Sequence, residues 1–380
     1  MKGMVKMKGM VKMKGKKVLL YLIMCIGLVS CSKNEQEGYG ENYNRKYDSQ
    51  NFSANREQTV TEDGFYTIQE EYIFFVDKKS GKAIPLCGKV NCKHNDSTCN
   101  AYFNAPLNIQ AYDGKIYVVA RGSKDRTESL YRISLDGSKK EELKVLYANE
   151  DNDVSCALEF MIHRGYGYMV TNWVQKDRTE RTQSMYRISL DTSEKKEEIA
   201  SITGYVPLIY INESRGNKIY FSTNRYIDQD GKKLEVINYE LDILKDSIRK
   251  LDFFKDKTLI VAKDERYYCY QKGGKGLLSF DKDGGDEKNI FEWKYDETMI
   301  YHDEKYLYFD NMVYLYLHDL PDTKRRIVIV DYDGNKVCEW KKFGTKNLAI
   351  LWSDSEQLLL RNNEKETYQI VKMADLSKLE

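Results

Sequence analysis

One internal repeat constrains the fold of this 380-residue chain more than any other feature. Residues 124–128 read KDRTE, and the same five residues recur at positions 176–180. A second word, YRISLD, occurs at residues 131–136 and again at 186–191. Two identical words in the same order, separated by nearly the same interval, indicate an internal duplication.

The repeated unit is predicted to contain four short β-strands. In the clearest unit, apolar runs with a period of two lie at residues 108–112, 115–120, 130–135 and 142–147. Asp113-Gly114 separates the first two runs, and Asp-Gly at such a place is typical of a tight hairpin turn with positive φ at both central residues. Successive hairpins of this kind make a four-stranded antiparallel meander.

The same plan fits the rest of the chain. Further units are expected at residues 157–202, 208–251, 258–293, 299–340 and 348–378, after an incomplete unit at 60–87. A tyrosine recurs on the second run, at Tyr117, Tyr168, Tyr220, Tyr268 and Tyr308. Four strands in a unit of roughly 40 to 50 residues predict an all-β fold, a β-propeller of four-stranded antiparallel blades.

We expect this β-propeller to occupy residues 56–380 and to have seven blades, with six as the alternative. The last unit is short, so we expect a strand near residues 56–60 to complete it and close the ring. The 30 tyrosines favour half-buried strands in such a fold.

Residues 1–30 are predicted to be a lipoprotein signal peptide. Three lysines (Lys14, Lys16 and Lys17) precede the apolar residues 18–29, a run too short for the roughly 20 residues that span a bilayer. The run ends in LVSC, which resembles the lipobox of bacterial lipoproteins, whose cysteine receives a diacylglyceryl group with fatty acids such as palmitate. We therefore expect Cys31 to be lipidated and to anchor the protein in the cell membrane, facing outside the cytoplasm. An ordinary signal peptide followed by a chance cysteine is the alternative.

Residues 31–55 are predicted to be a disordered tether. From position 32 to position 59 the chain contains no Ile, Leu, Val or Met. Such a composition buries too little apolar surface to offset the entropy of ordering the chain.

The charge distribution argues against nucleic acid as the main partner. The net charge is +1, but residues 1–30 hold seven lysines and no acid, so the remainder carries 53 basic and 59 acidic residues. A body with this negative balance would repel a phosphate backbone.

The densest group of metal-binding residue types is Cys87, Cys92, His94 and Cys99. Three thiolates and one imidazole complete a tetrahedral zinc shell. A disulfide between two of the thiols is the alternative, and we prefer it to zinc because secreted proteins form disulfides. In both cases the expected role is structural, since the group would pin a loop.

The two KDRTE loops supply candidate ligand-binding residues, namely Asp125, Arg126, Asp177 and Arg178. They lie between the second and third strands of their units, and an arginine there could bind a carboxylate or sulfate in fork geometry. A solvated loop copied by the duplication is the alternative, and we favour it.

The chain contains no G-x-S-x-G and no H-E-x-x-H motif. We therefore expect a non-enzymatic module that binds an extracellular glycan or protein. A carbohydrate-active enzyme with paired carboxylates on one face of the propeller is the alternative.

Three features together carry a family resemblance: the lipobox, the phrase LYRISLDGSKKEEL, and the segment from Pro85-Leu86-Cys87 through Asn100-Ala101-Tyr102. With them the chain resembles uncharacterised lipoproteins of anaerobic Gram-positive bacteria, whose propeller is related to TolB-like and low-density-lipoprotein-receptor-like propellers. The resemblance implies a fold and a surface location but no established activity. An anaerobic habitat would weaken the case for the disulfide.

Overall fold

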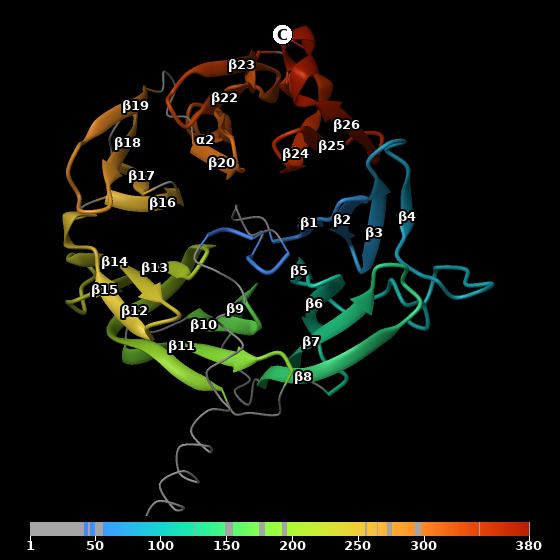
Figure 1. The fold of residues 1–380 in the computed structure, drawn as a ribbon, viewed down its shortest axis with the longest axis horizontal. Coiled ribbons are helices and arrows are strands. Elements are labelled where there is room, and N and C mark those ends of the chain that lie inside the picture. Colours follow the sequence, from blue (N-terminus) through green and yellow to red (C-terminus); the bar gives the residue numbers. More distant parts are fainter. Residues whose placement is uncertain are drawn as a thin grey trace, which may run out of the picture. The chain divides into compact units, whose positions relative to one another are not determined.

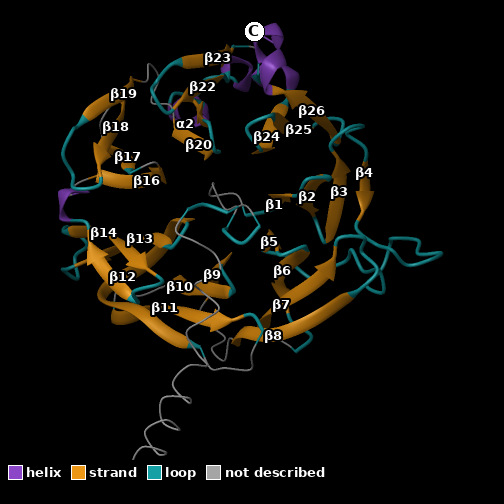
Figure 2. Ribbon diagram, viewed as in Figure 1, coloured by secondary structure: helices purple, strands orange, loops and turns teal. Residues whose placement is uncertain are grey.

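The computed structural model describes residues 42–44, 46–49, 56–124, 126–148, 155–174, 179–191, 196–254, 257–263, 265–271, 276–292, 298–341 and 343–379. The chain divides into two units after Gly40, and every described residue belongs to the second unit, Glu41–Glu380. Strands dominate this unit and its helices are short (Figure 2). In the described part of the chain, no helix is both long and apolar enough to cross a membrane. The prediction of an all-β fold is confirmed.

The described strands form six antiparallel sheets. The first contains β1 (Gln58–Val60), β2 (Gly64–Gln69), β3 (Tyr72–Asp77) and β4 (Ala83–Pro85). The second contains β5 (Asn108–Tyr112), β6 (Lys115–Arg121), β7 (Thr127–Ser134) and β8 (Lys140–Ala148). The third contains β9 (Ser155–His163), β10 (Tyr166–Val174), β11 (Glu180–Ser189), β12 (Glu197–Arg215), β13 (Lys218–Tyr226), β14 (Leu234–Asp242) and β15 (Ser247–Lys250).

The remaining sheets follow in chain order. The fourth contains β16 (Lys257–Lys263), β17 (Arg266–Gln271), β18 (Gly276–Asp281) and β19 (Lys288–Glu292). The fifth contains β20 (Thr298–His302), β21 (Tyr306–Asp310), β22 (Ile327–Asp331) and β23 (Lys336–Trp340), and the sixth contains β24 (Leu348–Ser353), β25 (Gln357–Asn362) and β26 (Thr367–Lys372). The helical segments are α2 (Met312–Leu317), η2 (Asp252–Phe254), η3 (Asp322–Lys324), η4 (Gly344–Lys346) and η5 (Met373–Leu379).

The local predictions from the repeat hold in the second and third sheets. Asp113 has φ 44° and Gly114 has φ 70°, so the turn between β5 and β6 has the two positive φ angles that its sequence predicts. The two copies of YRISLD begin on β7 and β11 respectively, which are the third strands of their units.

One long strand joins two units of the third sheet. The first part of β12 pairs with β11, where Glu180 lies opposite Tyr205. The second part pairs with β13, ending with Arg215 opposite Lys218. Because β12 is at once the last strand of one unit and the first of the next, seven strands share one hydrogen-bonded sheet.

The sheets of the Glu41–Glu380 unit are arranged around a common centre, with the first strand of each unit innermost (Figure 1). Neighbouring inner strands contact one another: β1 contacts β5, β5 contacts β9, β12 contacts β16, and β24 contacts β1. The last of these contacts brings the two ends of the repeat array together.

The recurring tyrosines occupy one register position. Each lies on the second strand of its unit, is buried, and pairs with the inner-strand residue seven positions earlier in the chain. The pairs are Gln110 with Tyr117, Met161 with Tyr168, Glu213 with Tyr220, Val261 with Tyr268, and Tyr301 with Tyr308. The periodicity read from the sequence is therefore a spatial repeat of core tyrosines.

The inner residue of this register position also links consecutive units, by a side-chain hydrogen bond that we call a stitch. Thr59 Oγ1 accepts a hydrogen bond from Ala111 N at 2.9 Å. The other stitches run from Gln110 to Ile162 N (2.7 Å), from Glu213 to Ala262 N (2.5 Å) and from Tyr301 to Ser353 O (2.7 Å). All these groups are buried or half-buried, so each stitch satisfies backbone groups that the sheets leave unpaired.

The predicted closure of the ring is wrong. We expected a strand near residues 56–60 to complete the last sheet, but β1 pairs with β2, with Val60 opposite Phe65. The sixth sheet has three strands, and β26 is followed by the helical segment η5, which packs against β23 and β26. Among the described strands β1 pairs with β2 alone, so the three strands of the sixth sheet gain no fourth strand from it.

Residues 42–49 pack against the sheets, although they lie within the segment for which we predicted a disordered tether. Asp48 is buried, and its Oδ1 accepts a hydrogen bond from Arg164 Nε at 2.6 Å. Its Oδ2 accepts one from Gly216 N at 2.8 Å, and Ser49 N donates to His163 Nδ1 at 3.2 Å. A polar composition does not reveal that a carboxylate has a buried arginine to pair with.

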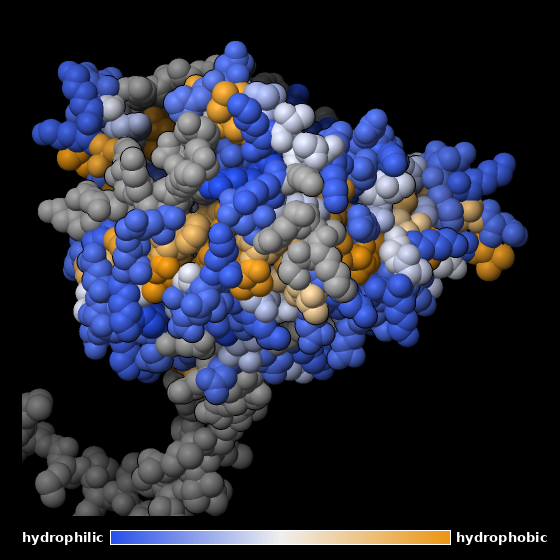
Figure 3. Space-filling view, turned by 90° about the horizontal axis from the view of Figure 1, so that it is seen from above, coloured by the Kyte–Doolittle hydropathy of each residue, from blue (hydrophilic) through white to orange (hydrophobic). Residues whose placement is uncertain are grey.

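The surface seen in Figure 3 is mostly hydrophilic, with small hydrophobic areas between charged side chains. This matches a chain in which 31% of the residues are charged. The apolar side chains lie instead in several separate core clusters between adjacent sheets.

Candidate functional site

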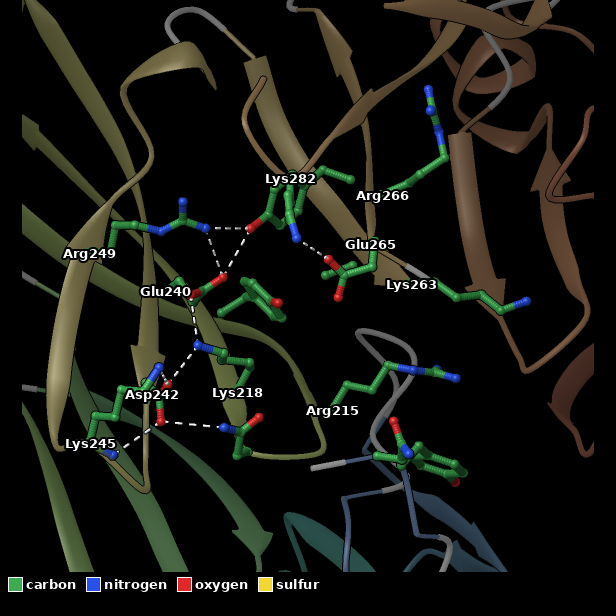
Figure 4. A pocket seen from close by; sticks show the side chains of 16 residues that line it. Arg215, Lys218, Glu240, Asp242, Lys245, Arg249, Lys263, Glu265, Arg266 and Lys282 are labelled. Carbon is green, nitrogen blue, oxygen red and sulfur yellow. Dashed lines mark hydrogen bonds and ion pairs between the residues drawn. The ribbon is translucent and has the colours of Figure 1, made fainter. Parts of the chain in front are cut away.

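A polar pocket lies where the third and fourth sheets meet, with a volume of about 510 Å³ (Figure 4). Its lining comes from β12 to β17, from the β18–β19 turn, and from the docked residues Asn42 and Tyr43. A pocket of this size is in the range of small-molecule sites.

The pocket carries an excess of positive charge. Seven basic and three acidic side chains line it: Arg215, Lys218, Lys245, Arg249, Lys263, Arg266 and Lys282, with Glu240, Asp242 and Glu265. A concave site with this balance attracts anions.

One wall is a chain of ion pairs on β13 and β14. Lys218 Nζ lies 3.0 Å from Glu240 and 2.8 Å from Asp242. Arg249 adds a second cation to Glu240 at 3.1 Å, and Lys245 a second to Asp242 at 3.4 Å. Figure 4 shows these side chains side by side in the pocket.

Both carboxylates in this wall are held in the ionised form. Burial opposes ionisation of Glu240, but hydrogen bonds and charge from Lys218, Tyr267 and Arg249 hold its pKa below the usual value. Burial likewise opposes ionisation of Asp242, and Lys218 with Lys245 lowers its pKa. Neither group is therefore a proton donor near neutral pH.

The opposite wall presents Arg215 and Lys263 from β12 and β16. Arg215 lies 2.9 Å from Glu304 and places its guanidinium 5.0 Å from the centre of the Tyr43 ring. Lys263 donates to the Glu304 carbonyl at 2.8 Å. These contacts fix both cations at the pocket wall.

A buried acid lies behind this wall. Burial raises the pKa of Glu213 to about 8, and its Oε2 accepts a hydrogen bond from Ala262 N at 2.5 Å. Its other oxygen is buried and has no hydrogen-bond partner among the described residues. Glu213 does not line the pocket, and its carboxyl group acts in the stitch, where it accepts the N–H of Ala262.

Sequence reasoning missed this pocket, because its residues come from strands far apart in the chain. One local signal was present: Glu240 and Asp242 are two positions apart on a strand, which places both carboxylates on the same face.

The predicted metal ligands, in contrast, do come together. Cys87, Cys92, His94 and Cys99 lie in the connection between β4 and β5, and their donor atoms all lie within 4.8 Å of one another. His94 Nδ1 is 3.3 Å from Cys99 Sγ. The base of this connection is in the core, where Cys99 and Phe103 pack between the first two sheets.

The thiols of Cys87 and Cys99 differ in acidity. Burial opposes ionisation of Cys87, but backbone N–H groups of Lys89 and Asn100 hold the pKa of its thiol below the usual value. Burial raises the pKa of Cys99 to about 12, against the opposing effect of Ala101 N–H.

The disulfide that we preferred from the sequence is absent at this cluster, where Cys87, Cys92 and Cys99 are free cysteines. The preference rested on secretion alone, which does not reveal how three sulfurs and an imidazole are arranged. The four donor atoms converge, as they do around a shared metal ion. A disulfide would join only two of the thiols and would not require the third thiol and the imidazole to lie beside them.

The predicted ligand-binding loops are only partly described. Asp125, Asp177 and Arg178 lie outside the described residues. Arg126 is exposed, has φ 55°, and lies between β6 and β7 as predicted. It lines neither the polar pocket nor a second cavity of about 590 Å³ beside β8, which Leu143, Val145 and Met169 help to line.

Comparison with protein-family models gives no match, and comparison with curated proteins gives none. Comparison with solved structures does find similar folds. A prolyl endopeptidase structure aligns with a TM-score of 0.52 at 11% identity, covering 93% of this chain and 54% of that one. This chain therefore spans about half the length of that protein.

Two further structures have lower scores. The β-propeller domain of the Trilobed protease from Pyrococcus furiosus aligns with a TM-score of 0.49 at 12% identity, covering 86% of this chain and 96% of that one. TolB from Acinetobacter baumannii aligns with a TM-score of 0.38 at 11% identity, covering 72% and 59%. The chain is thus an all-β protein with repeated blades, similar in structure to β-propeller proteins.

Proposed function

We propose that this protein is a lipid-anchored β-propeller that binds an anionic glycan outside the cytoplasm, and that the polar pocket is the binding site. The observation that carries the proposal is the charge of the pocket lining, with seven basic and three acidic side chains. Lys282 exposes 62% of its side chain and its partner Glu265 exposes 76%, so this lysine can reach a ligand without leaving a buried partner.

Binding is a better explanation of this pocket than glycoside hydrolysis. Hydrolysis by two carboxyl groups needs one that stays protonated to donate to the leaving group. Glu240 and Asp242 are both held ionised by Lys218, and Glu265 is an exposed partner of Lys282 at 3.0 Å. The pocket therefore offers fixed charges and no general acid.

The propeller is proposed to have seven blades. Seven inner strands support this count, since the third sheet contains two of them, β9 and the second part of β12. The anchor is proposed at Cys31, on the lipobox-like sequence LVSC. Cys31 lies outside the described residues.

An array of acidic and neutral oligosaccharides, probed with the purified full-length protein, tests the function. We expect binding to acidic members, weakening as salt screens the charges. Lys282→Ala should reduce binding severalfold. The matched control is Lys336→Ala, which removes another exposed lysine that pairs with a glutamate at 3.0 Å but does not line the pocket.

Equal binding to neutral glycans, or a Lys282→Ala variant that binds like the wild type, would contradict the proposed site. Product analysis of any bound oligosaccharide separates the two classes of function. Release of shortened products would favour the enzyme, and recovery of the intact ligand supports the binding module.

A further inference from the structure

We propose that Cys87, Cys92, His94 and Cys99 bind one zinc ion, which fixes the connection between the first two sheets. The four donor atoms lie within 4.8 Å of one another. Around a tetrahedral zinc, with Zn–S of about 2.3 Å, neighbouring donors lie about 3.5 to 4 Å apart. A small inward movement of the side chains therefore completes the shell.

The backbone supports sulfur ligands at two places. Two backbone N–H groups lie near sulfurs of the cluster, that of Lys89 near Cys87 and that of Ala101 near Cys99. Asn100 N–H adds a third such contact, to Cys87. Hydrogen bonds from outside the metal shell to its ligands are typical of protein metal sites, because they orient the ligands and stabilise their charge.

The charge around the cluster fits a zinc site with three thiolates. Such a site has a net charge of −1, because three thiolates exceed the two positive charges of the ion. Lys140 lies beside it, half-buried, with its ammonium 4.0 Å from the centre of the Phe103 ring and a hydrogen bond to the Tyr102 carbonyl. Among the described residues no carboxylate forms an ion pair with it, and Cys99 is the acidic group whose charge acts on it.

The cluster is built into the junction between the sheets. Asn100 is buried and donates to the carbonyls of Gly137 and Ser138, in the turn between β7 and β8. A Cβ atom at Gly137 would lie 2.6 Å from the backbone of Leu86 and Cys87, so the turn and the cluster are in close contact. A metal here would hold the connection between β4 and β5 against the second sheet.

Zinc is the metal that this donor set favours. Three sulfurs and one imidazole suit a tetrahedral, redox-inactive ion. Calcium and magnesium instead require oxygen ligands such as carboxylates and carbonyls, and this set of four donors contains none. The four protein ligands fill the shell, so the role is structural rather than catalytic.

Metal analysis of the full-length protein, purified without oxygen, tests the proposal. We expect one zinc per chain, and thiols of the cluster that react with a thiol reagent only after a chelator removes the metal. His94→Ala should lower zinc occupancy severalfold, whereas His94→Cys should keep it by supplying a fourth thiolate. Asn95→Ala is the matched control, since Asn95 is an exposed residue of the same loop.

Cobalt substitution gives a readout that does not depend on stability. We expect the absorption of a tetrahedral cobalt–thiolate site in the wild type, changed in His94→Cys and lost in Cys92→Ser. A metal-free wild type with a disulfide among Cys87, Cys92 and Cys99 would overturn the proposal. Iron in place of zinc, or zinc retained in full by both His94→Ala and Cys92→Ser, would overturn it as well.

Discussion

Gln110 Oε1 accepts a hydrogen bond from the backbone N–H of Ile162 at 2.7 Å, although the two residues are 52 positions apart in the chain. The same separation joins Thr59 to Ala111 and Tyr301 to Ser353. The side chain comes each time from a residue of the inner strand, and that residue pairs with a residue on the second strand of the same unit. The interval of 52 residues between the two KDRTE words is therefore also the interval of these three hydrogen bonds, while the one from Ala262 to Glu213 spans 49 residues.

Loss of a stitch should destabilise the protein measurably. Gln110→Leu leaves the buried N–H of Ile162 without its acceptor, which should lower the free energy of unfolding by about 1 to 3 kcal/mol. Urea unfolding followed by fluorescence measures this. Lys115→Ala, at an exposed position of the next strand, is the control and should change stability by less than about 0.5 kcal/mol. Equal stability of the two variants would show that the stitch contributes nothing.

The docked segment 42–49 should depend on one buried ion pair. Asp48→Asn leaves the fully buried guanidinium of Arg164 without its counter-charge, so we expect a loss of about 3 to 5 kcal/mol in unfolding free energy. Limited proteolysis should then cut the segment faster. Lys46→Ala removes an exposed pair with Asp113 in the same segment and should cost at most about 1 kcal/mol. Similar effects of both variants would refute the importance of the buried pair.

Stability should fall as the pH falls below 6.5. Burial lowers the pKa of His163 to about 4, so between these two values the unfolded chain binds a proton that the folded chain does not. The free energy of unfolding is unaffected by this group above pH 6.5, and it decreases by up to about 3 kcal/mol as the pH approaches 4. Burial of His302 acts in the same direction and lowers its pKa to about 3.

Urea midpoints measured from pH 7.5 down to pH 4.5 check this dependence. His163→Gln removes one of the two groups and should make the pH profile shallower, even if the variant is less stable at neutral pH. An unchanged slope in this variant would assign the acid sensitivity to other groups.

Lipidation should depend on Cys31. The wild-type protein is expected to partition with membranes and to incorporate a fatty acid, whereas Cys31→Ser should give an unprocessed precursor without the label. Cys25→Ser, in the same N-terminal segment, is the control and should be labelled like the wild type. Release of unlabelled wild-type protein into the medium would contradict the lipobox interpretation.

Features that repeat locally could be predicted from the sequence. The strands of the second sheet, the Asp113-Gly114 turn and the buried tyrosines from Tyr117 to Tyr308 follow from alternation, turn chemistry and the repeat period. Each depends on residues close together in the chain, where sequence spacing determines spatial spacing.

Features that depend on contacts between units could not be predicted. The polar pocket joins residues of two sheets to Tyr43, and no local pattern connects them. The burial of Asp48 depends on Arg164, which is 116 positions away. The convergence of Cys87 with His94 and Cys99 was foreseen as a possibility, but spacing alone does not distinguish a shared ion from a disulfide.

The stitches have a consequence for how such a gene can change. Each one begins at the same register position of one unit and ends at the residue after that position in the next, so a unit copied in tandem brings with it the group that its new neighbour needs. The duplicated words KDRTE and YRISLD are the trace of such a copying event. Because one unit supplies the side chain and the next supplies the backbone group, the array can gain or lose whole stitched units while these hydrogen bonds are kept.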